Sequence, residues 1–282
     1  MADPRYPRRV SEGRAIAALG LVGGHDPTGG AGVIRDVVTA RALAPELRPR
    51  VVVSAWTAQG DGAPARAVAR PWARVAAEVE SIPKGAVIKV GMVPAALVEA
   101  GLVDALRRGG GAWVVDPVLW ASDGGRLGEV GSARALARGA ALVTPNRPEA
   151  AALAGTSAED PELLARVVEA LEGAPVLLKD GHGGGREVRD RLWVAGEVHS
   201  FARPRLAGPD PRGTGCALAT AIAVGMARGL SLAAAIGEAI AWLDGARQRW
   251  RAGPGGAIHL PGAIEEVAID VSERPVFAVA GR

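Results

Sequence analysis

The stretch Gly208-Pro-Asp-Pro-Arg-Gly-Thr-Gly-Cys216 is a loop rich in helix breakers, and it leads into the apolar run Ala217-Leu-Ala-Thr-Ala-Ile-Ala-Val-Gly-Met-Ala227. Prolines and glycines exclude regular structure before Thr214, whereas residues 217–227 contain no proline and are rich in helix formers. We therefore predict a helix that begins between Thr214 and Cys216. The unpaired N–H groups of its first turn and the positive end of its dipole predict an anion site.

Cys216 is the only cysteine in the 282 residues and falls in the first turn of this predicted helix. A free thiol with a pKa of about 8.5 is about one-tenth ionised at pH 7.5, and a helix N-terminus worth ~1.4 kcal/mol would raise that to about half. This interpretation makes Cys216 a base or a nucleophile. The alternative is that the lone cysteine packs as a small buried hydrophobic residue.

Short apolar segments alternate along the chain with helical segments of about ten or more residues. This alternation predicts an α/β fold with a mostly parallel sheet covered by helices on both faces. The predicted strands are 16–22, 51–55, 86–92, 112–118, 140–144, 175–178, a hairpin over 191–201 and a tail strand at 276–280. The predicted helices cover 71–81, 95–108, 160–171 and 232–251. Another follows the glycine-rich loop that ends at Gly32 and runs to about residue 43, one starts near Asn146, and the central one begins between Thr214 and Cys216 and runs to residue 227.

The composition is that of an ordinary globular protein, with 49% hydrophobic and 22% charged residues. A net charge of +3 makes no case for nucleic-acid binding, and the longest apolar run is too short to span a membrane. We expect a disordered leader over residues 1–13 and one domain over residues 14–282. A single cysteine fits a reducing compartment, so we expect a cytoplasmic protein.

Lysine, asparagine and glutamine are so rare in this chain that each occurrence suggests a need for its side-chain chemistry. The rare residues are Lys84, Lys89, Lys179, Asn146, Gln59 and Gln248. Four of these, together with Asp116, fall at the ends of predicted strands, where open α/β sheets bind ligands. Structural alternatives stay open: Lys89 could snorkel to the surface, and Asn146 with Glu149 has the spacing of a helix capping box.

A second glycine-rich loop follows the first predicted strand, from Gly23 to Gly32. It matches neither a P-loop, which needs Lys and Ser/Thr after its second glycine, nor the dinucleotide fingerprint, because Arg35 occupies the position of the third glycine. A tight turn between strand and helix is the alternative. Asp26 is the one side chain in this loop that we expect to bind a polar ligand.

Seven motifs in order resemble the hydroxymethylpyrimidine and phosphomethylpyrimidine kinases of thiamin biosynthesis, within the ribokinase superfamily. They are Gly23-Gly-His-Asp-Pro-Thr-Gly-Gly-Ala-Gly32, Thr57-Ala-Gln59, Lys89-Val-Gly-Met92, Val114-Val-Asp-Pro-Val118, Thr144-Pro-Asn-Arg-Pro-Glu-Ala150, Leu178-Lys-Asp-Gly-His182 and Gly213-Thr-Gly-Cys216. The resemblance covers about residues 15–250. It implies a three-layer α/β/α ribokinase-like fold and phosphorylation of 4-amino-5-hydroxymethyl-2-methylpyrimidine, then of its monophosphate.

The resemblance also implies roles for individual residues, with ATP as co-substrate and Mg²⁺ as cofactor. Catalysis is assigned to an anion hole of Gly213, Thr214 and Gly215, with Cys216 as the base. The residues expected to bind ATP and its metal network are Lys179, Asn146, Asp116 and Thr144, with Glu149 and Asp116 toward the metal. The residues expected to bind the pyrimidine are Gln59, Asp26, Gly24, Gly30, Met92 and Lys89.

Several positions depart from the family pattern. Gly60, Asp180 and Arg212 stand where asparagine, glycine and histidine are usual, and Trp56 and Trp120 are bulky residues near the expected pocket. Two alternative functions therefore stay open, a pyridoxal kinase and a non-catalytic pyrimidine or nucleotide sensor. The expected partners are the small pyrimidine and ATP, with neither nucleic acid nor membrane, and the expected assembly is a homodimer.

Overall fold

The computed structural model describes residues 17–58, 65–121, 124–181, 185–208, 210–252, 258–262, 267, 269–270, 272 and 274–275. The predicted leader at 1–13, Gln59 and the predicted tail strand at 276–280 lie outside these residues. Within them, no helix is both long and apolar enough to cross a membrane.

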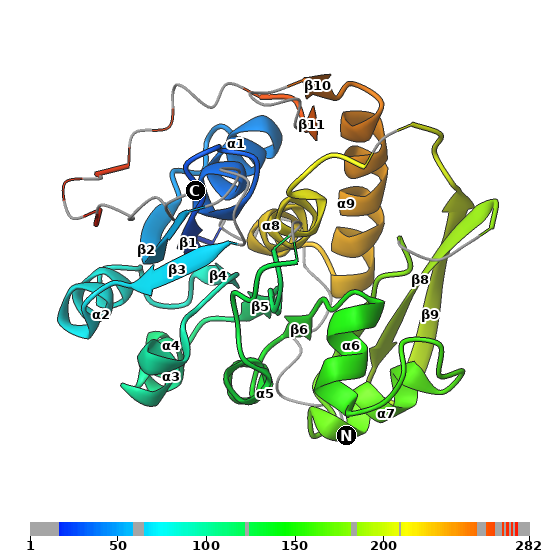
Figure 1. The fold of residues 1–282 in the computed structure, drawn as a ribbon, viewed down its shortest axis with the longest axis horizontal. Coiled ribbons are helices and arrows are strands. Elements are labelled where there is room, and N and C mark those ends of the chain that lie inside the picture. Colours follow the sequence, from blue (N-terminus) through cyan, green and yellow to red (C-terminus); the bar gives the residue numbers. More distant parts are fainter. Residues whose placement is uncertain are drawn as a thin grey trace, which may run out of the picture.

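A nine-stranded sheet forms the middle layer of the molecule (Figure 1). Its strands are β1 (Leu19–His25), β2 (Arg50–Ala58), β3 (Arg66–Ala69), β4 (Val87–Val90), β5 (Trp113–Val115), β6 (Leu142–Val143), β7 (Val176–Leu178), β8 (Glu187–Val194) and β9 (Glu197–Pro204). They lie in the order β3-β2-β1-β4-β5-β6-β7-β8-β9. The six strands from β2 to β7 in this order are parallel, and β3, β8 and β9 add antiparallel edges.

Helices cover both faces of this sheet. One face carries α1 (Gly32–Leu43), α8 (Thr214–Ala227) and α9 (Leu232–Arg247). The other carries α2 (Trp72–Glu80), α3 (Ala95–Glu99), α4 (Leu102–Gly109), α5 (Val130–Ala137), α6 (Arg147–Ala154) and α7 (Leu163–Ala170). Neighbouring strand residues alternate between the two cores, so Val114 packs under α8 and Val115 packs toward α2 to α7. The predicted three-layer α/β/α fold is confirmed.

Helix α8 occupies the centre of its layer, between α1 and α9 (Figure 1). It begins at Thr214, as predicted, and nearly every side chain from Ala217 to Ala227 is buried. A helix that is apolar on all sides must be enclosed by other elements. Its polar N-terminus is the end that reaches the carboxyl edge of the sheet.

Some predicted boundaries are wrong. The single helix predicted over 95–108 is two helices, because Gly101 adopts a left-handed conformation with φ 115° between α3 and α4. Strand β1 continues to His25, beyond the predicted end at residue 22, because it pairs with β2 as far as Trp56. Helix α9 ends at Arg247, ahead of the predicted 251, and a short hairpin of β10 (Arg251–Ala252) and β11 (Ile258–His259) follows.

Besides the β10–β11 hairpin, the edge strand β3 and the helix α5 were not expected from the sequence. Both are short, and neither has a long periodic apolar pattern. The hairpin predicted over 191–201 is confirmed as β8 and β9, which turn at Ala195 and Gly196.

Candidate active site

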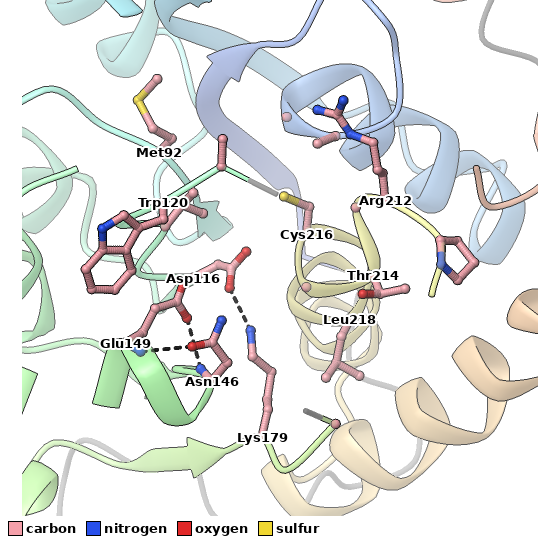
Figure 2. Close-up of a pocket in the computed structure, with 18 of the residues that line it drawn as sticks. Met92, Asp116, Trp120, Asn146, Glu149, Lys179, Arg212, Thr214, Cys216 and Leu218 are labelled. Atoms are coloured by element: carbon pink, nitrogen blue, oxygen red, sulfur yellow. Dashed lines mark hydrogen bonds and ion pairs between the residues drawn. The ribbon is translucent and has the colours of Figure 1, made fainter. Parts of the chain in front are cut away.

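A pocket of about 650 Å³ opens where the carboxyl ends of the parallel strands meet the N-terminus of α8 (Figure 2). The strand-end residues that line it are Lys89 near the end of β4, Asp116 after β5, Asn146 after β6 and Lys179 after β7. Cys216 faces them from α8. The structure therefore gathers residues that are scattered through the sequence at one edge of the sheet.

Glycine is required where the loop enters α8. Gly213 has φ 76°, and a Cβ atom at this position would lie 2.1 Å from the backbone oxygen of Gly30. No side chain caps the helix and its first turn holds no acidic residue. Gly215 brings that turn against the opposite wall, since a Cβ there would lie 3.3 Å from the Lys179 Nζ. The first turn can thus present N–H groups to an anion.

Lys179 and Asp116 form an ion pair across the floor of the pocket. Lys179 Nζ donates to Asp116 Oδ1 over 3.0 Å, and the Thr144 hydroxyl lies 3.4 Å from the same oxygen. Burial opposes ionisation of Asp116, but Lys179 and Lys89 outweigh it and hold the pKa of this carboxyl below its usual value. Burial likewise opposes the charge on Lys179, but Asp116 and Glu149 raise the pKa of the ammonium.

Asn146 and Glu149 form the capping box of α6. Asn146 Oδ1 accepts from the Glu149 N–H, and Glu149 Oε2 accepts from the Asn146 N–H, both over 2.9 Å. The capping interpretation is therefore confirmed, and both side chains also line the pocket. Burial, with a smaller contribution from Asp116, raises the pKa of Glu149 to about 7 against the opposing charge of Lys179.

The predicted ionisation of Cys216 is wrong. Burial raises the pKa of the thiol to about 12; Asp116 and Asp36 add to this rise, and the cation of Lys89 opposes it. The favourable helix N-terminus is outweighed because partial burial and the carboxylates of Asp116 and Asp36 all disfavour the thiolate. The thiol keeps its proton at neutral pH and lies within hydrogen-bonding reach of Asp116.

The far end of the pocket is less polar. Met92, Val118, Trp120 and Leu127 line it together with the Gly23 and Gly24 backbone. Gly24 packs closely on Met92, because a Cβ there would lie 2.8 Å from the Met92 Cε. The Trp120 side chain is 41% exposed, so a flat apolar surface stands open at the pocket wall (Figure 2).

Comparisons with known proteins show the family of this chain. The family model described as phosphomethylpyrimidine kinase matches residues 26–261. The chain belongs to the phosphomethylpyrimidine kinase family. It is 36% identical over 248 residues to a hydroxymethylpyrimidine/phosphomethylpyrimidine kinase of Rhizobium meliloti, covering 82% of this chain and 91% of that protein.

Solved structures support the fold assigned to this phosphomethylpyrimidine kinase family member. The phosphomethylpyrimidine kinase of Clostridium difficile matches with a TM-score of 0.66 and 25% identity, over 83% of this chain and 100% of that chain. The pyridoxal kinase of Staphylococcus aureus in complex with AMP-PCP matches with a TM-score of 0.76 and 21% identity, over 88% and 93%. The second match shows the fold alone.

The other residues predicted to bind the pyrimidine are in contact with other groups of the protein. Asp26 lines the pocket, but its carboxylate accepts from Thr28 and from the Ala31 N–H, and it pairs with Arg212 over 3.5 Å. Gly30 packs against His259, and Lys89 is buried against Asp36. Gln59 lies outside the described residues.

The structure also shows residues that the sequence analysis did not assign. Trp56, expected near the pocket, is buried and packs edge-on against His25 with ring centroids 5.2 Å apart. Asp36 was missed, although a charged residue within the apolar pattern of residues 33–38 is a sequence feature that could have revealed it. Asp190 and Arg203 line the pocket as an ion pair of 2.8 Å, and no local sequence pattern indicated them.

Proposed function

We propose that this chain transfers the γ-phosphoryl group of ATP to the hydroxymethyl group of 4-amino-5-hydroxymethyl-2-methylpyrimidine and then phosphorylates the resulting monophosphate. The observation that carries the proposal is the facing arrangement of Lys179 and Asp116 against the uncapped first turn of α8, in one pocket. Phosphoryl transfer needs little covalent chemistry and much positioning and charge neutralisation. A helix N-terminus and a fixed cation supply both.

The reaction itself follows from these positions. The acceptor hydroxyl oxygen attacks the γ-phosphorus, the bond from that phosphorus to the bridging oxygen breaks, and its electron pair leaves with ADP. The N–H groups of Gly213, Thr214 and Gly215 stabilise the charge on the transferred group. The hydroxyl proton passes to the Cys216 sulfur as the thiol proton passes to the Asp116 carboxylate, so Cys216 acts as a relay that begins protonated.

Mg²⁺ fits this donor set. Among the described residues no group of three or more His, Cys, Asp or Glu side chains could hold a metal ion. Mg²⁺ is commonly held by one or two carboxylates, waters and substrate phosphates, and both Glu149 and Asp116 line the pocket. We assign these two carboxylates, with Asn146, to the metal network through water. When bound, the ion would neutralise charge on the ATP phosphates.

Apolar side chains support the choice of an aromatic acceptor. The Met92 side chain and the exposed face of Trp120 offer contact to a flat heteroaromatic ring. Gln59 stays our prediction for the aminopyrimidine edge, because its amide matches a ring nitrogen beside an exocyclic N–H. Replacement of Gln59 by leucine should weaken pyrimidine binding by roughly ten- to a hundredfold, with little change in ATP affinity.

The test is ATP-dependent phosphate transfer to a panel of hydroxymethyl heteroaromatics. Transfer is measured by the release of ADP and by the mass of the product. We expect both pyrimidine substrates to be phosphorylated in the presence of Mg²⁺, and each far better than pyridoxal. Preferential turnover of pyridoxal would reject this proposal and show that the chain is a pyridoxal kinase. Binding of the pyrimidine without turnover of any acceptor would favour a sensor.

We also propose that the chain acts in the cytoplasm as a homodimer. The absence of an internal disulfide is compatible with a reducing compartment. Sedimentation of the full chain would test the assembly, and a monomer across the working concentration range would reject it.

A further inference from the structure

A buried ion pair lies at the base of the pocket, next to the residues proposed for catalysis. Lys89 Nζ lies 2.8 Å from Asp36 Oδ2, with side-chain exposures of 1% and 0%. Lys89 comes from β4 and lines the pocket, whereas Asp36 comes from α1. The pair therefore joins the sheet to the helical layer directly behind the site.

Asp36 has a second partner on the helix that carries the anion hole. The Thr220 hydroxyl donates to Asp36 Oδ1 over 2.8 Å, deep in the core. Thr220 lies four residues after Cys216, so both side chains lie on the same side of α8. The carboxylate of Asp36 thus contacts both a pocket-lining cation and α8, one turn after Cys216.

Stability alone does not account for these three residues. Removing two charges from water is costly, and a buried ion pair can often be replaced by apolar side chains without loss of stability. The ammonium of Lys89 is, however, close enough to act on the other residues of the pocket. Lys89 lines the same pocket as Cys216 and Asp116, and the carboxylate of Asp36, 2.8 Å from the Lys89 Nζ, offsets the cost of burying this cation.

We propose that Asp36, Lys89 and Thr220 form a positioning network. It fixes α8, one turn after Cys216, relative to β4, and it holds a cation in the pocket with Cys216 during phosphoryl transfer. No bond to Lys89 is made or broken. A preorganised cation stabilises negative charge that develops on the reacting oxygen and sulfur atoms, without reorganisation during the reaction. Lys89 is thereby reassigned from the pyrimidine subsite to a position behind the reacting groups.

This inference rests on the proposed kinase function, so wild-type turnover is measured first. The main variant is Asp36→Asn with Lys89→Met, which removes both charges together and keeps an oxygen for the Thr220 hydroxyl. We expect its thermal midpoint to stay near that of the wild type and its kcat to fall by about tenfold or more, with KM for ATP and for the acceptor changed by less than about threefold. A wild-type kcat in this variant would overturn the proposal.

A matched control removes another ion pair. Arg70 and Glu78 lie 2.8 Å apart outside the pocket, and Arg70→Met with Glu78→Gln should leave kcat unchanged. If kcat falls equally in this control, the loss reflects general destabilisation and the proposal fails. Absence of turnover in the wild type would instead reject the proposed function, so the two failures are distinguishable.

A second pair of variants tests the hydrogen bond between Thr220 of α8 and Asp36. These variants keep the proposal falsifiable if the double variant does not fold. Thr220→Val removes the hydroxyl at nearly constant shape, and Thr220→Ser keeps it. We expect kcat to fall several-fold in the valine variant, with KM values preserved, and to recover in the serine variant. Equal kcat in both variants would overturn the role of Thr220 and of the network.

Discussion

Lys179 holds its ammonium 3.0 Å from the carboxylate of Asp116, although the two residues lie 63 positions apart in the chain. The pair exists because β5 and β7 are both neighbours of β6 and end at the same edge of the sheet. It faces Gly215, in the turn that we assign to the transferred phosphoryl group. Five predictions concern the groups around this pair.

Replacement of Lys179 by methionine removes the cation that faces the anion hole and leaves a buried carboxylate without its partner. We expect kcat to fall by about a hundredfold or more and KM for ATP to rise. Steady-state kinetics with ATP as the varied substrate measures both. Lys84→Met is the matched control, because Lys84 is exposed and does not line the pocket. Wild-type kinetics in the Lys179 variant would remove this residue from the site.

The raised pKa of Glu149 predicts a pH-dependent rate. With a pKa of about 7, Glu149 is largely protonated at pH 6 and largely ionised at pH 8. If the carboxylate organises the metal, kcat/KM should rise between these values, and Glu149→Gln should be slow and lack this rise. A Gln variant with normal Mg²⁺-dependent activity would leave Glu149 with its capping role alone.

The same pKa predicts how folding stability changes with pH. Because the folded pKa lies above the ordinary value of 4.5, the folded state binds more protons between these two values, and this contribution to stability is lost as the pH rises toward 7. Glu149→Gln has no such group. The difference in unfolding free energy between the two proteins, measured by urea denaturation, should therefore shift in favour of the Gln variant from pH 4.5 to 7. A constant difference would contradict the raised pKa.

Cys216 should react slowly with iodoacetamide. Because burial holds the pKa of its thiol near 12, the alkylation rate should still be rising at pH 10, and the chain has no other cysteine to confuse the measurement. A plateau of the alkylation rate below pH 9 would show that the thiol ionises near neutral pH, as we predicted from the sequence. Cys216→Ser should fold normally and lose most of its rate, because a hydroxyl is a poorer relay than a thiol.

Gly213→Ala tests the geometry of the anion hole. The left-handed backbone costs an alanine about 1 to 2 kcal/mol, and the contact of 2.1 Å with the Gly30 oxygen forces the loop to shift. We expect a large loss of kcat together with a lower melting temperature. Gly131→Ala is the control: it lies exposed in α5 with open space around it, and it should be neutral or slightly stabilising. Full activity in the Gly213 variant would show that this turn does not hold the phosphoryl group.

The sequence by itself determined the alternation of strands and helices, the start of α8 and the place of the rare polar residues at strand ends. These features depend on local periodicity and on helix breakers, which act over a few residues. The same local reasoning joined α3 to α4, because nothing in the apolar pattern shows that Gly101 takes a left-handed backbone.

Only the tertiary structure decided the electrostatics of the site. Asp36 and Lys89 meet across 53 positions, and the state of Cys216 depends on burial beside Asp116 and Asp36. The pKa of a group depends on its removal from water and on charges within a few ångströms, and packing alone brings those charges together. The sequence therefore indicated many of the polar residues that line the pocket, whereas the fold decided which of them are paired, which are charged and which keep their protons.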